Sequence, residues 1–357
     1  MANLSDYIAW RGDLTFSDSE FNAVDSLILC CLIYIHFDDI MSENDVITIN
    51  EANTAFCNLP QEKRIMRAKE DKALLHIAAK SRRFGNLALS DYVSHFDFDK
   101  EKQFAAITIN LGGNNTFIAF RGTDNTLIAW KEDFNMSFLD IVPSQIDAAE
   151  YLKTVADKIK GTLYIGGHSK GGNLAIYASA HSTEKIQKRI KTIYNHDGPG
   201  FNSNIINFSG YCSIINKIQT YVPQSSVIGM LLNHQEPYTV VHSTQRGVLQ
   251  HDPYSWKVMG ADFIKLEGTS KVSKTLDNTL TEWLAHTSPI QRERFVDALY
   301  TVFNGTENKK TFPPSTSWRE NAEILITQWK NTSPKKRNII NKHFKTIINT
   351  AINNTGK

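Results

Sequence analysis

The chain has 357 residues, 41% of them hydrophobic, with 39 basic and 37 acidic side chains and a net charge of +2. This length suits a large core in one or two domains, and the near-neutral charge excludes the strongly basic surface typical of nucleic-acid-binding proteins. The four cysteines lie mostly inside apolar runs without metal-ligand or disulfide-framework spacing, so we expect reduced thiols in a cytoplasmic protein that needs no metal or organic cofactor.

The sequence predicts neither a secretory signal nor a membrane span. Residues 1–6 lack the basic start and the apolar stretch of a secretory signal. The longest apolar run, from Leu27 to Ile35, falls well short of the roughly 18 residues needed to cross a bilayer. We therefore expect a soluble intracellular protein.

Helices are predicted over residues 21–36 and 42–84. A polar and aromatic segment over residues 1–16 leads into an apolar helix from Phe21 to His36, whose lack of a polar face indicates burial. Residues 42–84 have a charged helical pattern. These charges fit a solvated helix face best, and a mobile cover over a site is the alternative.

Near residue 87 the hydrophobic period changes to two, which predicts strands. Residues 91–98, 103–109 and 116–120 are expected to be strands, with a hairpin turn between the last two. A helix over 144–161 then leads into a strand at 163–168. Strand, helix and strand in this order form a right-handed crossover of a parallel sheet.

Further strands are expected at 190–194, 214–222 and 238–242, and polar segments follow them. Polar groups just past the carboxyl ends of successive parallel strands are where an open α/β sheet binds ligands. The sequence therefore predicts an α/β fold in which helices flank a mostly parallel sheet.

Gly167-His168-Ser169-Lys170-Gly171 is the motif around which this sheet is organised. An apolar run precedes it and an alanine-rich helical run follows it, which is the strand, turn and helix context of a Gly-x-Ser-x-Gly nucleophile. Ser169 then lies at the tip of the turn, and the backbone N–H of Lys170 points at the negative oxygen of a tetrahedral intermediate. The alternatives are a glycine-rich turn that binds nothing and a phosphate loop, whose pattern does not fit residues 166–173.

Residues 263–357 predict a helical appendage to a domain over residues 1–262, which includes the N-terminal helices at 17–84. Helix-capping residues open helices at Ser288, Ser317 and Ser333-Pro334, and Gly305 ends one of them. The last helix has a basic face, which fits a solvated face on a helix packed against the core. A weak contact with an anionic membrane surface is the alternative.

These residues resemble a known family. Phe120-Arg121-Gly122-Thr123, with Trp130 and Asp133 downstream and the Ser169 motif beyond, is similar to the class 3 lipases of the α/β-hydrolase fold. That resemblance covers roughly residues 90–260, a typical span for one α/β core. From Trp10-Arg11-Gly12-Asp13 to His251-Asp252-Pro253-Tyr254, nearly the whole chain resembles the bacterial Mbeg-like branch of this superfamily.

The resemblance implies roles for individual residues. Ser169 corresponds to the nucleophile, Thr123 to the first oxyanion-hole residue and Lys170 to the second. Thr123 would donate its backbone N–H and its hydroxyl, and an ordinary turn residue is the alternative. Trp130 and Asp133 are then expected to brace the Thr123 loop.

The base follows the nucleophile along the chain in this fold. His234, His242 and His251 qualify by position. His251 matches the lipase pattern of a histidine a few residues before an aromatic pair, here Tyr254 and Trp256. We therefore expect His251 to be the base.

The acid departs from the family pattern. Class 3 lipases have an aspartate two residues before a Val-Pro pair, and Thr220 stands at that position here. Asp197, just past the preceding strand, is the substitute we expect, and a turn aspartate that caps backbone N–H groups is the alternative. Asp252 is too close in sequence to His251 to orient its ring easily. Without a carboxylate in reach, Ser169 and His251 would form a weaker dyad.

The function we predict is a serine hydrolase that acts on carboxylic esters through an acyl-enzyme on Ser169. Lipid or acylglycerol esters are implied by the family resemblance alone. Two alternatives stay open: an acyltransferase that uses the same site, and an inactive binding or regulatory protein, for which the missing aspartate is the chief motive. The expected partner is a small-molecule ester or lipid, and the sequence does not define the oligomeric state.

Overall fold

The computed structural model describes residues 2–97, 99–124, 131–133, 135–136, 139–304 and 327–355. It divides into two compact units. The first contains Met1–Phe96, Phe104–Gly122 and Ser144–Ser270, and the second contains Asp97–Gln103, Thr123–Pro143 and Lys271–Lys357. Trp130, Gly305 and Ser317, for which the sequence predicts roles, lie outside the described residues. The division into a domain over 1–262 and an appendage over 263–357 stays a prediction.

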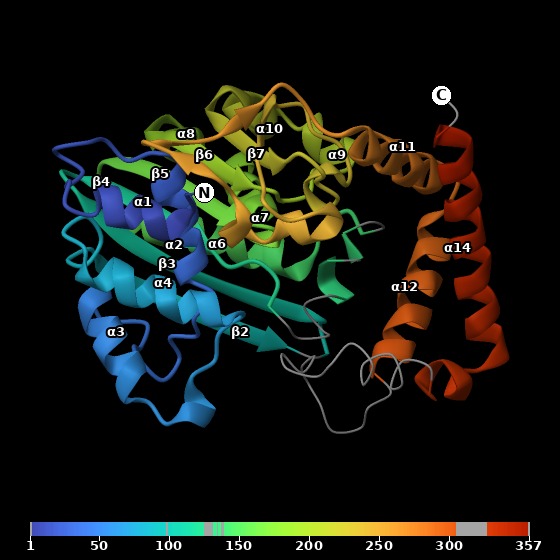
Figure 1. Ribbon diagram of the computed structural model, residues 1–357, viewed down its shortest axis with the longest axis horizontal. Helices are drawn as coiled ribbons and strands as arrows, with labels where there is room; N and C mark the ends of the chain where they lie inside the picture. The colour runs from blue at the N-terminus through green and yellow to red at the C-terminus, as the bar shows by residue number, and fades with distance from the viewer. Residues whose placement is uncertain are drawn as a thin grey trace. The chain divides into compact units, whose positions relative to one another are not determined.

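A nine-stranded mixed sheet forms the centre of the first unit. Its strands are β1 (Ile47–Thr48), β2 (Ala88–Asp97), β3 (Lys102–Gly112), β4 (Asn115–Phe120), β5 (Thr162–His168), β6 (Ile190–His196), β7 (Ile218–Pro223), β8 (Tyr238–Val241) and β11 (Lys265–Leu266), in that spatial order (Figure 1). Strands β4 to β8 are parallel neighbours, whereas β3 pairs with β4, and β11 with β8, in antiparallel fashion. The expectation of a mostly parallel sheet therefore holds for the middle of the sheet and not for its edges.

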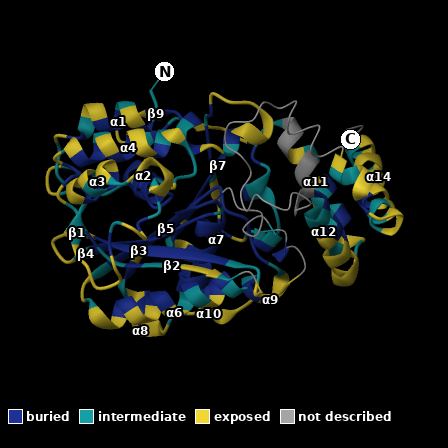
Figure 2. Ribbon diagram, turned by 90° about the horizontal axis from the view of Figure 1, so that it is seen from below, coloured by how far each residue is buried: buried dark blue, intermediate teal, exposed yellow. Residues whose placement is uncertain are grey.

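The crossover helices of the parallel strands cover one face of the sheet. They include α6 (Pro143–Lys158), α7 (Lys170–Ala180), α8 (Glu184–Arg189) and α10 (Ser209–Ile214). Because the strand order follows the chain and each crossover is right-handed, these helices all lie on the same face (Figure 2). Leu152, Leu174 and Tyr211 from three of them share a core with the strands.

The N-terminal helices cover the opposite face (Figure 2). They are α1 (Leu4–Arg11), α2 (Ala23–Leu32), α3 (Ile49–Asn58) and α4 (Lys69–Lys80). Every residue of α2 is buried, so the prediction of a buried apolar helix is confirmed. In α4, Leu74 and Leu75 are buried while Lys69 and Lys72 are exposed, which fits a solvated charged face at these lysines. The expectation is wrong for Asp71, which is fully buried and pairs with Arg67. Trp256 and Phe263 complete this side of the core.

Short elements connect the main ones in the first unit. They are α9 (Ser203–Ile206), the 3₁₀ turns η1 (Gln61–Lys63), η2 (Ile215–Lys217), η3 (Ile228–Met230), η4 (Gly247–His251) and η5 (Pro253–Ser255), and the hairpin of β9 (Val258–Met259) and β10 (Asp262–Phe263). The strand expected at 214–222 begins only at Ile218, because η2 occupies the residues before it. The loops after β6, β7 and β8 carry the polar residues considered next.

Three helices dominate the second unit: α11 (Lys271–Ala285), α12 (Pro289–Asn304) and α14 (Pro334–Thr355). Trp283, Phe295 and Ile340 from these helices share a small core. Lys131 Nζ lies 2.5 Å from Glu101 Oε1 and 3.0 Å from Asp297 Oδ1, which joins the three chain segments of the unit.

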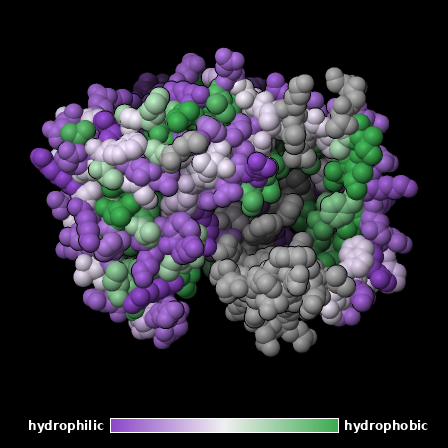
Figure 3. Space-filling view, viewed as in Figure 1, coloured by the Kyte–Doolittle hydropathy of each residue, from purple (hydrophilic) through white to green (hydrophobic). Residues whose placement is uncertain are grey.

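The predicted helix opening at Ser288 is confirmed. Gln291 N donates to Ser288 Oγ, and Ser288 N donates to the Gln291 side chain, at 3.3 and 2.9 Å. The apolar side chains of Phe344, Ile348 and Ile352 on α14 are exposed. Apolar residues gather along one side of this unit in the space-filling view (Figure 3). Among the described helices, none combines the length and the hydropathy needed to cross a bilayer.

Candidate active site

Ser169 lies at a sharp turn between β5 and α7. Its backbone has φ +58° and ψ −134°, a conformation that L-residues rarely adopt. A Cβ atom on Gly167 would lie only 2.0 Å from the carbonyl carbon of Gly171, so a side chain at this position would prevent the strand and the helix from approaching. The strand, turn and helix predicted for the Gly-x-Ser-x-Gly motif are therefore present.

The structure brings Ser169, His251 and Asp197 together. His251 Nε2 lies 2.9 Å from Ser169 Oγ, and His251 Nδ1 lies 2.7 Å from Asp197 Oδ2. The carboxylate is fully buried, whereas the imidazole is 26% exposed. A carboxylate oxygen accepts the Nδ1 proton of a neutral imidazole, which leaves Nε2 free to accept the serine proton.

Asp197 follows β6 and is held by the loop after β7. Its backbone N–H donates to the Tyr221 carbonyl at 2.8 Å, and Ser226 Oγ donates to Asp197 Oδ1 at 2.5 Å. Gly229 lies so close that a Cβ atom there would be 2.2 Å from Oδ1. Ser226 and Gly229 have no recognisable signal in the sequence, because their contact with Asp197 exists only once β6 and β7 pair.

The two oxyanion-hole candidates fall in different units. Lys170 is the first residue of α7, and a helix leaves its first N–H groups without an acceptor in the helix itself. Gly122, in the first unit, approaches so closely that its Cβ would lie 3.2 Å from Ser169 Cβ. Thr123 follows Gly122 along the chain, belongs to the second unit, and donates its hydroxyl to the Asp133 carboxylate.

A second buried carboxylate lies next to the position where class 3 lipases have their aspartate. Thr220 Oγ1 donates to Glu236 Oε1 at 2.8 Å, and His234 Nδ1 lies 2.9 Å from the same oxygen. Burial would raise the pKa of Glu236, but the hydrogen bonds and charge of His234, with the Tyr211 hydroxyl, lower it. His234 is therefore paired with Glu236. Its Nε2 has no hydrogen-bond partner among the described residues.

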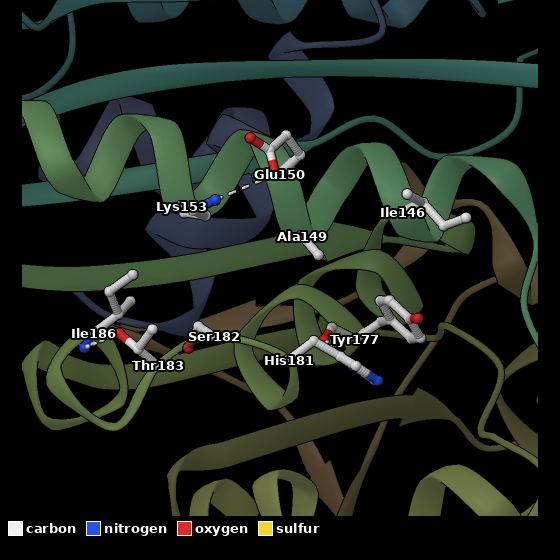
Figure 4. Close-up of a pocket in the computed structure, with 9 residues that line it drawn as sticks. All are labelled: Ile146, Ala149, Glu150, Lys153, Tyr177, His181, Ser182, Thr183 and Ile186. Atoms are coloured by element: carbon white, nitrogen blue, oxygen red, sulfur yellow. Dashed lines mark hydrogen bonds and ion pairs between the residues drawn. The ribbon is translucent and has the colours of Figure 1, made fainter.

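A pocket in the first unit lies away from the predicted site residues. A half-open pocket of about 230 Å³ lies between α6 and the α7–α8 connection, where Ile146, Tyr177 and His181 line it (Figure 4). None of the predicted site residues lines this pocket. No group of three or more His, Cys, Asp or Glu residues among the described residues is arranged to hold a metal ion.

Comparisons with known proteins identify the family of the chain. No curated protein matches it. Among solved structures, one described as "Rhizomucor miehei lipase propeptide complex, native" has 16% identity and a TM-score of 0.33, over 43% of this chain and 57% of that chain, less than two-thirds of its length. This likeness is too weak to carry an argument. A model of the Mbeg1-like family matches residues 78–301, more than half of the chain, and the protein therefore belongs to the Mbeg1-like family.

Proposed function

We propose that this protein is a serine hydrolase of carboxylic esters, with Ser169 as nucleophile, His251 as general base and Asp197 as the acid that orients the base. The observation that carries the proposal is the pair of distances on either side of the His251 ring, 2.9 Å to Ser169 Oγ and 2.7 Å to Asp197 Oδ2. Both fall in the range in which a proton can be transferred or held. The assignment of the sheet to the α/β-hydrolase fold is part of the proposal.

The proposed reaction has two steps. Ser169 Oγ attacks the ester carbonyl carbon while its proton passes to His251 Nε2, and the protonated imidazole then protonates the departing alcohol. In the second step water attacks the acyl carbon and gives a proton to the same nitrogen. The imidazolium then returns this proton to Ser169 Oγ as the acyl bond to Ser169 breaks, which releases the acid and restores both residues. Asp197 stays ionised throughout and stabilises the imidazolium.

The negative oxygen of each tetrahedral intermediate needs hydrogen-bond donors. The backbone N–H of Lys170, at the positive end of α7, is the donor supported by its place at the helix start. We assign the second donor to the backbone N–H of Thr123. This assignment rests on the family resemblance.

The substrate class rests on the family resemblance. Lipid or acylglycerol-type esters are therefore proposed, and no described residue favours acyl transfer to an acceptor other than water. The motive for an inactive binding protein was the absence of an aspartate at Thr220. Asp197, 2.7 Å from His251 Nδ1, removes that motive.

The test is the hydrolysis of a series of p-nitrophenyl and acylglycerol esters of increasing chain length by the purified protein. We expect turnover that Ser169→Ala lowers by at least about 10³-fold, the scale of loss for a missing nucleophile. Ser182→Ala, which removes a serine hydroxyl bound to the Ser179 carbonyl outside the site, should keep the wild-type rate. Equal rates for wild type and Ser169→Ala would contradict the proposal. Analysis of the products with added alcohols separates hydrolysis from acyl transfer.

A further inference from the structure

His168, the last residue of β5, lies against His251 without taking part in the proton transfers proposed above. Its side chain is buried, and the centroids of the two imidazole rings are 4.6 Å apart with 33° between their planes. His168 Nε2 lies 2.9 Å from the carbonyl oxygen of His251. The residue before the nucleophile thus contacts both the ring and the backbone of the base.

The hydrogen-bond partners of His168 define the tautomer of the neutral ring. A carbonyl oxygen only accepts, so Nε2 donates its N–H to His251. In a neutral ring Nδ1 is then an acceptor, and the Tyr34 hydroxyl, 2.9 Å away, donates to it. Burial, followed by the neighbouring His251 and Arg67, lowers the pKa of His168 well below its usual value, which keeps this ring neutral.

Tyr34 is itself held by the N-terminal part of the chain. Its ring centroid lies 4.1 Å from the guanidinium carbon of Arg67. A guanidinium nitrogen of Arg67 lies 3.6 Å from Asp71 Oδ1. Asp71 also accepts a hydrogen bond from the Tyr254 hydroxyl at 2.7 Å. Tyr254 lies three residues after His251, so the N-terminal segment supports the histidine loop at a second point.

We propose that His168 is a positioning residue for His251, and that Tyr34 fixes the tautomer in which His168 donates to the His251 carbonyl. This inference rests on the proposed function, because it takes His251 as the base. Proton transfer from Ser169 needs the imidazole in place, and a displacement of about 1 Å can cost about 10²-fold in rate. Tyr34 precedes residue 78, where the family match begins. A part of the chain outside that match therefore helps to position His251.

Four variants test the proposal through the rate of labelling by a fluorophosphonate probe. Tyr34→Phe removes only the hydroxyl that donates to His168, and we expect a rate about tenfold lower. His168→Leu removes the donor to His251, and we expect a loss of about 10²-fold. His168→Gln keeps an N–H near the Nε2 position and should recover most of the rate. Tyr151→Phe removes a buried hydroxyl bound to Thr108 on the other face of the sheet, and should label like the wild type.

The thermal midpoint of each variant separates positioning from general stability. If Tyr34→Phe and Tyr151→Phe lower the midpoint by similar amounts and only Tyr34→Phe slows labelling, the positioning role is supported. With a small ester, we expect kcat to fall while KM stays unchanged, because binding of the ester does not involve His168. Wild-type labelling rates in both Tyr34→Phe and His168→Leu would overturn the proposal.

A second readout does not depend on activity. The proton between His251 Nδ1 and Asp197 gives a downfield NMR resonance, which we expect in the wild type and in Tyr151→Phe, and expect shifted or broadened in Tyr34→Phe and His168→Leu. An unchanged resonance in these two variants would overturn the positioning role even if the wild type failed to label. Failure of the wild type to label, with the resonance altered as expected, would contradict the proposed function alone.

Discussion

Asp197 has a positive φ of +55°, which is uncommon outside glycine and which aspartate adopts more often than most residues. This conformation directs the fully buried carboxylate so that each oxygen has its own donor. Ser226 Oγ lies 2.5 Å from Oδ1 and His251 Nδ1 lies 2.7 Å from Oδ2. One oxygen orients the imidazole while the other is tied to the loop after β7. The orientation of His251 therefore depends on Ser226 as well as on Asp197.

Ser226→Ala tests this dependence. The substitution leaves Oδ1 without the serine donor, and we expect the free energy of unfolding to fall by about 1–3 kcal/mol and ester turnover to fall about tenfold. Urea unfolding and ester hydrolysis measure the two effects. Ser213→Ala, which removes an exposed hydroxyl bound to the Ser209 carbonyl, is the control and should change neither. Unaltered stability and turnover in Ser226→Ala would contradict the role given to Ser226.

His196 predicts how stability depends on pH. The side chain is fully buried, and its Nε2 lies 2.6 Å from Ser26 Oγ. In the part of the chain that the structure describes, its Nδ1 has no hydrogen-bond partner. Burial lowers the pKa of His196 from 6.5 to about 3. Between these two values the unfolded chain binds a proton that the folded protein does not, so lowering the pH favours unfolding. The contribution of neutral His196 to the free energy of unfolding is fully present above pH 6.5. Between pH 6.5 and about 3 it is lost at about 1.4 kcal/mol per pH unit as the pH falls.

The comparison of wild type with His196→Leu isolates this contribution. Urea unfolding at pH 7.5, 6 and 5 should give a free energy of unfolding that falls more steeply with acidification in the wild type. A His76→Gln variant is the control, because the His76 side chain is exposed on α4 and the variant should keep the wild-type slope. If the free energy of unfolding falls equally steeply with pH in wild type and His196→Leu, His196 is not held neutral in the folded protein.

At the scale of elements, the 3₁₀ turn η3 packs its glycine against the acid. A Cβ on Gly229 would lie 2.2 Å from Asp197 Oδ1 and 2.9 Å from Val222 Cγ1. Gly229→Ala should therefore displace the turn or the carboxylate, with about 1–3 kcal/mol of lost stability and at least about tenfold lower turnover. At Gly268 a Cβ would meet no atom within 4 Å, so Gly268→Ala is the matched control. Equal turnover in the two variants, measured with the same ester, would contradict this packing argument.

Elements with strong local signals could be predicted from the sequence. β5, the glycine-lined turn and α7 are specified by residues that are neighbours in the chain, and α2 by an apolar run. The eight-residue helix α1 was not predicted, because its capping residues Asn3 and Asp6 carry a shorter signal than a periodic apolar face. Residues 215–217 form a turn rather than the start of β7, since a short apolar run does not distinguish helix from strand.

In the site, too, residues with a local sequence signal could be predicted and residues brought together only by the fold could not. Ser169 and His251 could be found from motifs, and Asp197 from the rule that polar residues gather at the carboxyl ends of strands. The contacts of Asp197 with Ser226 and of His168 with Tyr34 join residues 29 and 134 positions apart. They depend on how strands pair and how the N-terminal helices pack, which no local pattern encodes.

At the scale of the whole molecule, residues 1–77 supply much of the covering of one sheet face although they precede the family match. Asp25 on α2 accepts from the Tyr7 hydroxyl at 2.8 Å and is 2.5 Å from the Arg83 guanidinium, so α1, α2 and the segment before β2 are joined by buried polar contacts. These residues are therefore part of the first unit's fold.

A fragment of residues 78–357 should consequently fail to fold. Deletion of residues 1–77 removes α1, α2, α3 and most of α4. This would expose the apolar side of the sheet and leave Arg83 without the Asp25 carboxylate. We expect an insoluble fragment, or a soluble one without a cooperative thermal transition by circular dichroism. The full-length protein, purified in the same way, is the control. A cooperative transition with native-like near-ultraviolet dichroism in the fragment would show that the N-terminal segment is dispensable for the fold.

The most direct test of the central claim is intact-mass analysis of the protein after incubation with a fluorophosphonate probe. The account predicts one adduct on the wild type, located on Ser169 by peptide mapping, absent in Ser169→Ala, and formed about 10³- to 10⁴-fold more slowly in His251→Ala and Asp197→Asn. A wild-type protein that stays unlabelled, or an adduct that persists in Ser169→Ala, would contradict the assignment of Ser169 as an activated nucleophile.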